Sequence, residues 1–334
     1  MSPAPATPAS VAVIAVHADE AGLRLDRWFQ RHYPAISHGR LEKLLRTGQI
    51  RVDGKRARAG DRLDVGQQIR VPPMQLNAAA PSKPATRIED TRAAAALVAS
   101  VIHRDEHVIA LNKEPGLAVQ GGSRTTLHID GLLDALRFDG PDRPRLVHRL
   151  DKDTSGLLLL GRSAAAAAKL AEAFRARTTL KEYWAVVAGV PKAARGTIDL
   201  PLAKATGGAH GRESMVVDEA SGDRAVTDYE TADVAGKRAA LLVLRPLTGR
   251  THQLRVHCAA LGTPILGDGK YGGDRAFIDA PGLARTLHLH AARLVLPHPA
   301  RGSLRLFAPP PPHFRATVAA LGLEMPRDAP SRSR

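Results

Sequence analysis

The sequence predicts an α+β protein made of two domains. Its 334 residues suffice for two domains of ordinary size, with a sizeable core in at least one of them. A stretch rich in proline and alanine between Pro72 and Arg92 separates a short segment from a long one. Both segments contain apolar patterns typical of helices and others typical of strands. We therefore expect a disordered lead over 1–18, a small domain over 19–73, a linker over 74–95, a large domain over 96–322 and a disordered tail over 323–334.

The small domain is predicted to begin with two helices. The apolar residues of the first are spaced along one helix face and are Leu23, Leu25, Trp28 and Phe29. The second is expected to have Ser37 as its N-cap, a buried stripe at Leu41, Leu44 and Leu45, and Gly48 at its C-terminal stop.

Strands are expected to complete the small domain. Residues 50–52 and 55–56 are typical of two strands joined by the turn Asp53-Gly54, and residues 63–71 supply a further strand.

Positive charge is concentrated in this small domain. Residues 21–73 carry 12 Lys and Arg against 5 Asp and Glu, about half of the chain's net charge of +15. Such a surface suits RNA phosphates, although a solvated helix face would carry the same charges. The candidate RNA-binding residues lie on one side of the second helix and around the hairpin: Arg40, Lys43, Arg46, Arg51, Lys55 and Arg56.

Composition restricts the partners and the compartment. The basic excess favours a polyanionic partner, but a membrane surface, acidic proteins or a merely solubilising charge would also explain it. Apolar runs fall far short of a membrane span, and Val11–Val16 is too short for a signal-peptide core. The single cysteine, Cys258, excludes an intrachain disulfide and a multi-thiolate zinc site. We expect a cytoplasmic protein that does not enter the membrane, with Cys258 as a core residue.

In the large domain, charge gathers directly before an apolar strand. Five of the six residues 148–153 are charged or ionisable, and residues 157–160 continue as a strand before a helix over 164–174. Charges at such a place must be desolvated or paired, which suits a reactive site better than a stable fold. An ionised carboxylate at Asp151 can act as nucleophile or base. Asp153 is an alternative, better suited to a turn, and a structural salt-bridge loop is a third interpretation.

Two further segments hold candidate residues. Strand residues 181–187 include Tyr183, which is either a core aromatic or a ring that stacks on a base. In 248–257, Thr248 is a candidate helix cap, and four residues lie on neighbouring helical positions: Arg250, Gln253, Leu254 and His257.

The histidines of the large domain do not indicate a metal. The spacing of five between His252 and His257 suits neither a strand nor one helical stripe, so we expect no metal there. His288 and His290 share one strand face, where they pack or contact phosphate.

Motifs in both domains resemble known families. The small domain is similar to the αL-motif RNA-binding domain of the ribosomal protein S-four type, through Arg24-Leu25-Asp26-Arg27-Trp28, Ser37-His38-Gly39-Arg40-Leu41 and 50–55. The large domain resembles the RluA/RluC-type pseudouridine synthases, which act on ribosomal RNA. The matching motifs are 148–156, Lys181 with Tyr183, Ala185, Val187 and Gly189, 249–257, 261–268 with Tyr271-Gly272, and 287–291 with His298-Pro299.

This resemblance implies a fold and a chemistry. It implies a large catalytic domain on a mixed, largely antiparallel sheet with flanking helices. Asp151 would be the catalytic aspartate that converts uridine to pseudouridine in large-subunit ribosomal RNA, by attack at C1′ or at C6. Tyr183 would lie under the flipped base, where it could also move the C5 proton, and Arg250 would pair with Asp151. We also expect Arg149, His148 and Leu254 to bind substrate, with Arg149 filling the gap left by the extruded nucleotide.

The same resemblance implies no cofactor, since the reaction is an isomerisation. It also gives no sign of an obligate protein partner, so we expect a monomer. One departure is that Glu114 follows Asn112-Lys113 where the family has proline.

Two other functions remain open at this point. An inactive RNA-binding protein would not need the carboxylate, and a glycosidase using Asp151 and Asp153 would release a free base or sugar. A phosphotransferase is disfavoured because the sequence has no Gly-x4-Gly-Lys-Ser/Thr loop.

Overall fold

The chain consists of two units, residues 1–87 and 88–334, each with its own core. In the computed structural model the described residues are 11–33, 36, 38–73, 88–121, 127–176, 178–205 and 214–326. None of the helices in these parts of the chain combines the length and the apolar character that a membrane crossing requires.

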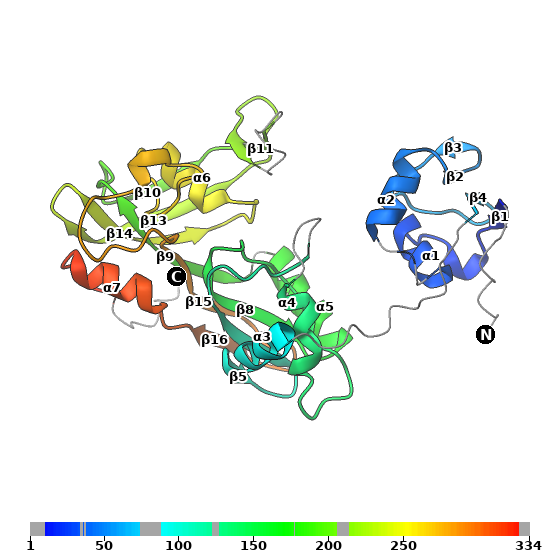
Figure 1. Cartoon of the computed structure of the whole chain (residues 1–334), viewed down its shortest axis with the longest axis horizontal. Coiled ribbons are helices and arrows are strands. Elements are labelled where there is room, and N and C mark those ends of the chain that lie inside the picture. Colours follow the sequence, from blue (N-terminus) through cyan, green and yellow to red (C-terminus); the bar gives the residue numbers. More distant parts are fainter. Residues whose placement is uncertain are drawn as a thin grey trace. The chain divides into compact units, whose positions relative to one another are not determined.

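The small unit packs two helices on a four-stranded sheet (Figure 1). Its helices are α1 (Leu25–His32) and α2 (His38–Arg46), and its strands are β1 (Ala12–Ala15), β2 (Arg51–Val52), β3 (Lys55–Arg56) and β4 (Gln68–Val71), in the order β1-β4-β2-β3. The core includes Trp28, Phe29 and Leu41, as the apolar spacing predicts. Leu23 lies before α1, and the predicted strand 63–71 is shorter than expected.

The hairpin prediction is confirmed at the turn itself. Val52 pairs with Lys55 across Asp53 and Gly54, whose φ angles are 48° and 75°. Two successive positive φ values are what a tight hairpin turn requires, and an Asp-Gly pair supplies them at low cost.

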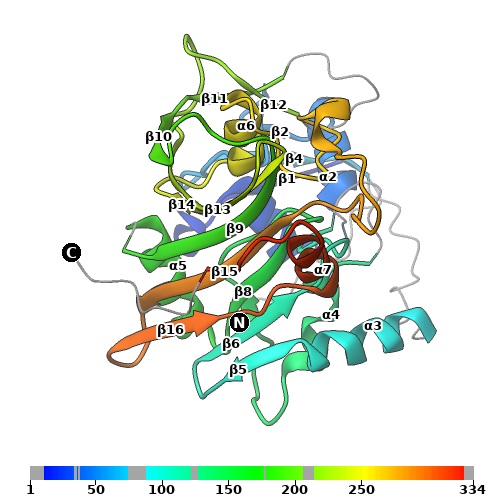
Figure 2. The same ribbon diagram turned by 90° about the vertical axis from the view of Figure 1, so that its left-hand side faces the viewer.

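The large unit is built on a ten-stranded sheet in the order β10-β13-β14-β9-β15-β8-β6-β5, with β16 beside β15 and β7 beside β8 (Figures 1 and 2). Its strands are β5 (Val101–Arg104), β6 (Val108–Lys113), β7 (Arg145–Leu146), β8 (Ser155–Gly161), β9 (Leu180–Ala188), β10 (Arg195–Asp199), β13 (Val226–Ala235), β14 (Ala239–Pro246), β15 (Leu289–Pro297) and β16 (Ser303–Phe307). Among these described strands, only β8 and β15 pair in parallel. The sheet is therefore mixed and largely antiparallel, which confirms the expected fold class.

Helices and a separate hairpin accompany the sheet. The α-helices are α3 (Ile88–Ala99), α4 (Ile129–Leu132), α5 (Ala164–Arg175), α6 (Gln253–Ala260) and α7 (Pro312–Ala320), two short 3-10 helices cover Leu133–Leu136 and Gly273–Ala276, and the hairpin consists of β11 (Leu202–Lys204) and β12 (Met215–Val217).

Strand β9 contributes side chains to both faces of the sheet. Because successive side chains of a strand point to opposite faces, Trp184 and Val186 pack with Phe314 of α7, whereas Ala185 and Val187 pack with Leu254 and Cys258 of α6. Tyr183 belongs to the second face, which carries the site.

Three predicted boundaries are wrong in part. Residues 12–15 of the expected disordered lead form β1, which pairs with β4. The last part of the expected linker, 88–95, belongs to α3. Leu323 of the expected tail is buried in the core beside Phe314. The errors at β1 and Leu323 have the same cause, because local composition does not reveal pairing or packing with distant segments, whereas α3 is a local Ala-rich helix that begins inside the expected linker. The expected N-cap Ser37 and residues 1–10, 74–87 and 327–334 lie outside the described residues.

Gly156 is the second residue of β8 and pairs in parallel with Ala291 of β15. Its φ is +107°, and a Cβ there would lie 2.2 Å from the carbonyl oxygen and 2.7 Å from the nitrogen of Ala291. We expect Gly156→Ala to destabilise the protein by about 3–5 kcal/mol, because strain and backbone overlap add.

The matched control is Gly262→Ala, since Gly262 has φ +84° and nothing within 4 Å of a built Cβ. It should cost only about 1 kcal/mol, the conformational part of the effect. Denaturant titration of both variants measures the difference, and equal losses of stability would contradict the close approach of Gly156 to β15.

Candidate active site

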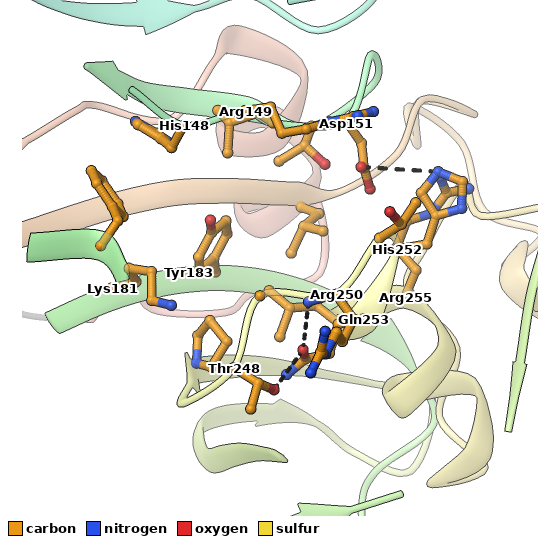
Figure 3. Close-up of a pocket in the computed structure, with 18 of the residues that line it drawn as sticks. His148, Arg149, Asp151, Lys181, Tyr183, Thr248, Arg250, His252, Gln253 and Arg255 are labelled. Atoms are coloured by element: carbon orange, nitrogen blue, oxygen red, sulfur yellow. Dashed lines mark hydrogen bonds and ion pairs between the residues drawn. The ribbon is translucent and has the colours of Figure 1, made fainter. Parts of the chain in front are cut away.

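Six residues predicted for chemistry and substrate binding line one cavity of about 600 Å³ in the large unit (Figure 3). They come from the loop before β8, from β9 and from the segment that leads into α6. These residues are His148, Arg149, Asp151, Tyr183, Arg250 and Leu254. The sequence therefore predicted correctly which segments meet.

Lys113 holds the loop that carries Asp151 in place. The buried ammonium of Lys113 donates hydrogen bonds to the carbonyl oxygens of Glu114, Leu117 and Lys152, at 2.8, 2.9 and 2.8 Å. Burial lowers the pKa of Lys113 to about 8, although the nearby carboxylates oppose this shift. One cation thus fixes the turn at Glu114 and the backbone next to Asp151.

His148 anchors the start of the same loop. Its Nε2 accepts a hydrogen bond from the backbone N–H of Leu159 in β8 at 2.8 Å, and its ring stacks on Phe174 at a centroid distance of 4.5 Å. Burial lowers the pKa of His148 to about 4, so the ring is neutral and able to accept this bond. Although His148 lines the cavity, its contacts indicate a role in holding the loop.

Asp151 lies where two cavities meet. Its side chain is 19% exposed, and it also lines a second cavity of about 500 Å³ with Lys152, Asp153 and Arg285. The side chain of Asp151 is therefore partly exposed, as a group that meets a substrate must be.

Tyr183 places its ring between the two core clusters and beside the cavity. Burial raises the pKa of its phenol, and the negative charge of Asp151 raises it further. The hydroxyl therefore keeps its proton, which leaves the ring free to act as an apolar surface with a neutral polar tip.

The predicted pairing of Arg250 with Asp151 is wrong. Arg250 precedes α6, which begins at Gln253, and its guanidinium bonds Asp223 at 3.1 Å and the carbonyl oxygen of Arg224 at 3.1 Å. Its side chain is 38% exposed. Arg250 thus reaches the rim of the cavity and holds the loop before β13, because its position in a loop directs it away from Asp151.

Arg255, and not Arg250, places a guanidinium next to Asp151 in the interior of the large unit. It is nearly buried, lines both cavities, and donates two hydrogen bonds to Asp268, at 2.8 and 2.7 Å. Its burial opposes the charged form, but Asp268 and then Asp151 outweigh burial and raise its pKa. Arg255 was not predicted from the sequence, although it stands two residues after Gln253 and Asp268 belongs to another matched motif.

Gln253 and Thr248 fix the segment before α6. The Oε1 of Gln253 accepts bonds from the Thr248 hydroxyl at 2.8 Å and from the backbone N–H of Arg250 at 3.0 Å, and its amide donates to Val226 and Thr227 of β13. Thr248 is therefore not the helix cap, which is the backbone of His252.

The remaining histidines and Cys258 have structural surroundings. His257 bonds Thr227 and the carbonyl oxygen of Leu200, away from His252. His288 and His290 are fully buried and bond Thr317 and the carbonyl oxygen of Ala308, so they pack and do not contact phosphate. Burial raises the pKa of Cys258 to about 12. In the described parts of the chain, no three His, Cys, Asp or Glu residues are arranged to hold a metal ion.

The predicted RNA-binding residues of the small unit share an exposed surface. All six are exposed, on α2 and on the β2–β3 hairpin. Arg51 is braced by bonds to the carbonyl oxygens of Gly48 and Gly54. The residues of this basic surface are Arg40, Lys43, Arg46, Arg51, Lys55 and Arg56.

Comparisons with known proteins agree with this site. The model of the RNA pseudouridylate synthase family matches residues 107–260, and that of the S4 domain matches residues 23–69. The chain is 37% identical to ribosomal large subunit pseudouridine synthase C of Rickettsia bellii, over 82% of this chain and 89% of that protein. It is 33% identical to the enzyme of the same name from Escherichia coli, over 90% of this chain and 93% of that one.

A solved structure is similar as well. Human RNA pseudouridylate synthase domain containing 4 aligns with a TM-score of 0.61 and 32% identity, over 72% of this chain and 99% of the human chain. The matched family region contains Asp151, Tyr183 and Arg255, so the likeness covers the cavity itself.

Proposed function

Because this chain belongs to the RNA pseudouridylate synthase family and isomerises uridine to pseudouridine in RNA, we propose that Asp151 is its catalytic carboxylate. The observation that carries this proposal is the position of Asp151 at the junction of two cavities, with Arg255 beside it. We also propose large-subunit ribosomal RNA as the substrate, since the similar bacterial proteins are named for it.

The uridine would enter the cavity after leaving its stack. Extruding a base costs a few kcal/mol, less in a loop than in a duplex. The ring of Tyr183 offers a stacking surface and packs against the apolar cluster that contains Leu254. Asp151 would bond to C1′ or C6, the bond between N1 and C1′ would break, and the uracil would turn so that C5 bonds C1′. The bond to Asp151 would then break, C5 would lose its proton and N1 would gain one, which leaves the RNA with the same atoms.

Tyr183 acts in this scheme as a stacking group. A raised pKa makes its phenolate a costly base, so the phenol would keep its own proton while the C5 proton leaves. The protonated phenol therefore favours stacking over the proton transfer that the resemblance also allows.

Arg255 would hold the carboxylate ionised and oriented. A guanidinium fixed by two bonds to Asp268 is already in position, so its orientation costs nothing when the reaction begins. Arg250 and Arg149 are more exposed and would contact the RNA around the extruded nucleotide.

The basic surface of the small unit would supply affinity that does not depend on sequence. Its exposed cations suit phosphates, and selection among sites would come from RNA shape. We further propose that the enzyme works in the cytoplasm, since the similar bacterial proteins are named for ribosomal RNA, and that it works as a monomer without an obligate protein partner.

The first test replaces Asp151 with the isosteric amide. Asp151→Asn should abolish pseudouridine formation and leave RNA affinity within about twofold, because only the charge that attacks the nucleotide is removed. To measure this, pseudouridine is mapped in ribosomal RNA from cells that lack the protein and in which either the wild type or Asp151→Asn has been restored. Asp153→Asn is the matched control. Loss of product in that variant alone would show that Asp153, and not Asp151, is the catalytic carboxylate.

A second test separates the two arginines. Arg255→Lys should lower the single-turnover rate about a hundredfold, because lysine cannot keep the two bonds to Asp268. Arg250→Lys should lower it less than about threefold, since its ion pair is exposed and is formed with Asp223 and not with Asp151. If Arg250→Lys lowered the rate more than Arg255→Lys does, Arg250 would be the arginine that holds Asp151.

A third test concerns the helix α2. Replacing Arg40, Lys43 and Arg46 together with alanine should reduce the slope of log affinity against log salt by about 0.7–0.9 for each phosphate that these side chains neutralise. Glu42→Gln on the same helix should leave the slope no smaller. An unchanged slope in the triple variant would show that α2 does not contact phosphates.

A further inference from the structure

His252 has a backbone conformation that histidine rarely adopts. Its φ and ψ are 52° and 18°, in the left-handed region. It is the N-cap of α6, yet its side chain caps nothing and points instead toward Asp151 (Figure 3). A strained residue whose side chain contributes nothing to its helix end indicates a requirement for the position of its ring.

The ring of His252 is held by a chain of hydrogen bonds. Its Nδ1 lies 2.6 Å from the hydroxyl of Tyr271, and that hydroxyl accepts a bond from the backbone N–H of Met215 at 3.2 Å. The Tyr271 hydroxyl has one proton to donate, and we assign that proton to the bond with Nδ1. With this assignment the neutral imidazole carries its own proton on Nε2.

That Nε2 faces the catalytic carboxylate. It lies 3.9 Å from Oδ1 of Asp151, beyond hydrogen-bond length, and both side chains are mostly buried. Burial lowers the pKa of His252, as do the positive charges of Arg255 and Lys270, against the opposing effects of Asp151 and Asp268. The ring is thus a neutral N–H donor about 1 Å short of bonding to Oδ1.

We propose that His252 is a positioning residue whose Nε2–H, fixed by Tyr271 and Met215, bonds Oδ1 of Asp151 when RNA enters and turns Oδ2 toward the uridine. This inference rests on the proposed role of Asp151. Hydrogen bonds between active-site groups are often long in the free enzyme and shorten when substrate is bound.

The same chain of bonds links a distant hairpin to the carboxylate. Met215 is the first residue of β12, and its side chain packs with Val256 of α6 in a small cluster that Tyr271 covers. The hairpin of β11 and β12 therefore supplies one backbone N–H to the arrangement at Asp151, although neither strand lines the cavity that holds Tyr183.

The test combines single-turnover kinetics with nitrogen NMR of the full-length enzyme. Tyr271→Phe removes the hydroxyl and keeps the ring, and His252→Asn keeps a residue that tolerates the left-handed region but has no ring. Tyr229→Phe is the matched control, because the Tyr229 hydroxyl has no hydrogen-bond partner among the described residues.

We expect the wild-type signal that disappears in His252→Asn to belong to a neutral imidazole protonated at Nε2. Tyr271→Phe should show a mixture of both tautomers. Both variants should lower the single-turnover rate about ten- to hundredfold with RNA affinity within about twofold of wild type, and Tyr229→Phe should match the wild type.

Two outcomes would overturn the inference. One is an Nδ1-protonated or doubly protonated His252 in the wild type. The other is a wild-type rate in His252→Asn, which would mean that the backbone conformation, and not the ring, is required. If Asp151→Asn is inactive in the same assay, such results refute the role of His252 alone, whereas an active Asp151→Asn refutes the proposed function.

Discussion

The site depends on the buried pair formed by Arg255 and Asp268. Removing both charges from water is costly, and the two short hydrogen bonds between them, together with a backbone N–H that Tyr271 donates to Asp268, offset that cost. The pair joins α6 to the loop after it and leaves the guanidinium next to Asp151. The positive charge beside the carboxylate is therefore part of the folded framework and is present before any RNA arrives.

The second constraint is the path of the chain around Asp151. Lys113 fixes the backbone after Asp151, His148 ties the loop to β8, and Gly156 allows the close parallel contact with β15. They are a buried ammonium, a histidine that burial keeps neutral and a glycine with positive φ. Together they restrict the loop to one conformation, which is what a carboxylate aimed at one atom of a nucleotide needs.

Much of the fold could be predicted from the sequence because its signals are local. The Asp53-Gly54 turn, the apolar faces of α1 and α2, the strand 157–160 and the helix 164–174 all follow from spacing and residue type. The role of Arg250 could not be predicted from the sequence, because spacing within 248–257 does not reveal that α6 begins at Gln253. That one boundary decides which arginine faces inward. The strand β1 was missed for a similar reason, since its partner β4 lies far along the chain.

The most direct test of the central claim is a crystal structure of the enzyme bound to a ribosomal RNA stem-loop that contains a target uridine. We expect an extruded uridine stacked on Tyr183, with a carboxylate oxygen of Asp151 about 3–3.5 Å from C1′ or C6 and Arg255 still bonded to Asp268. A uridine that remains stacked in the RNA, or one that lies in the cavity beyond the reach of Asp151, would contradict the proposed role of this carboxylate.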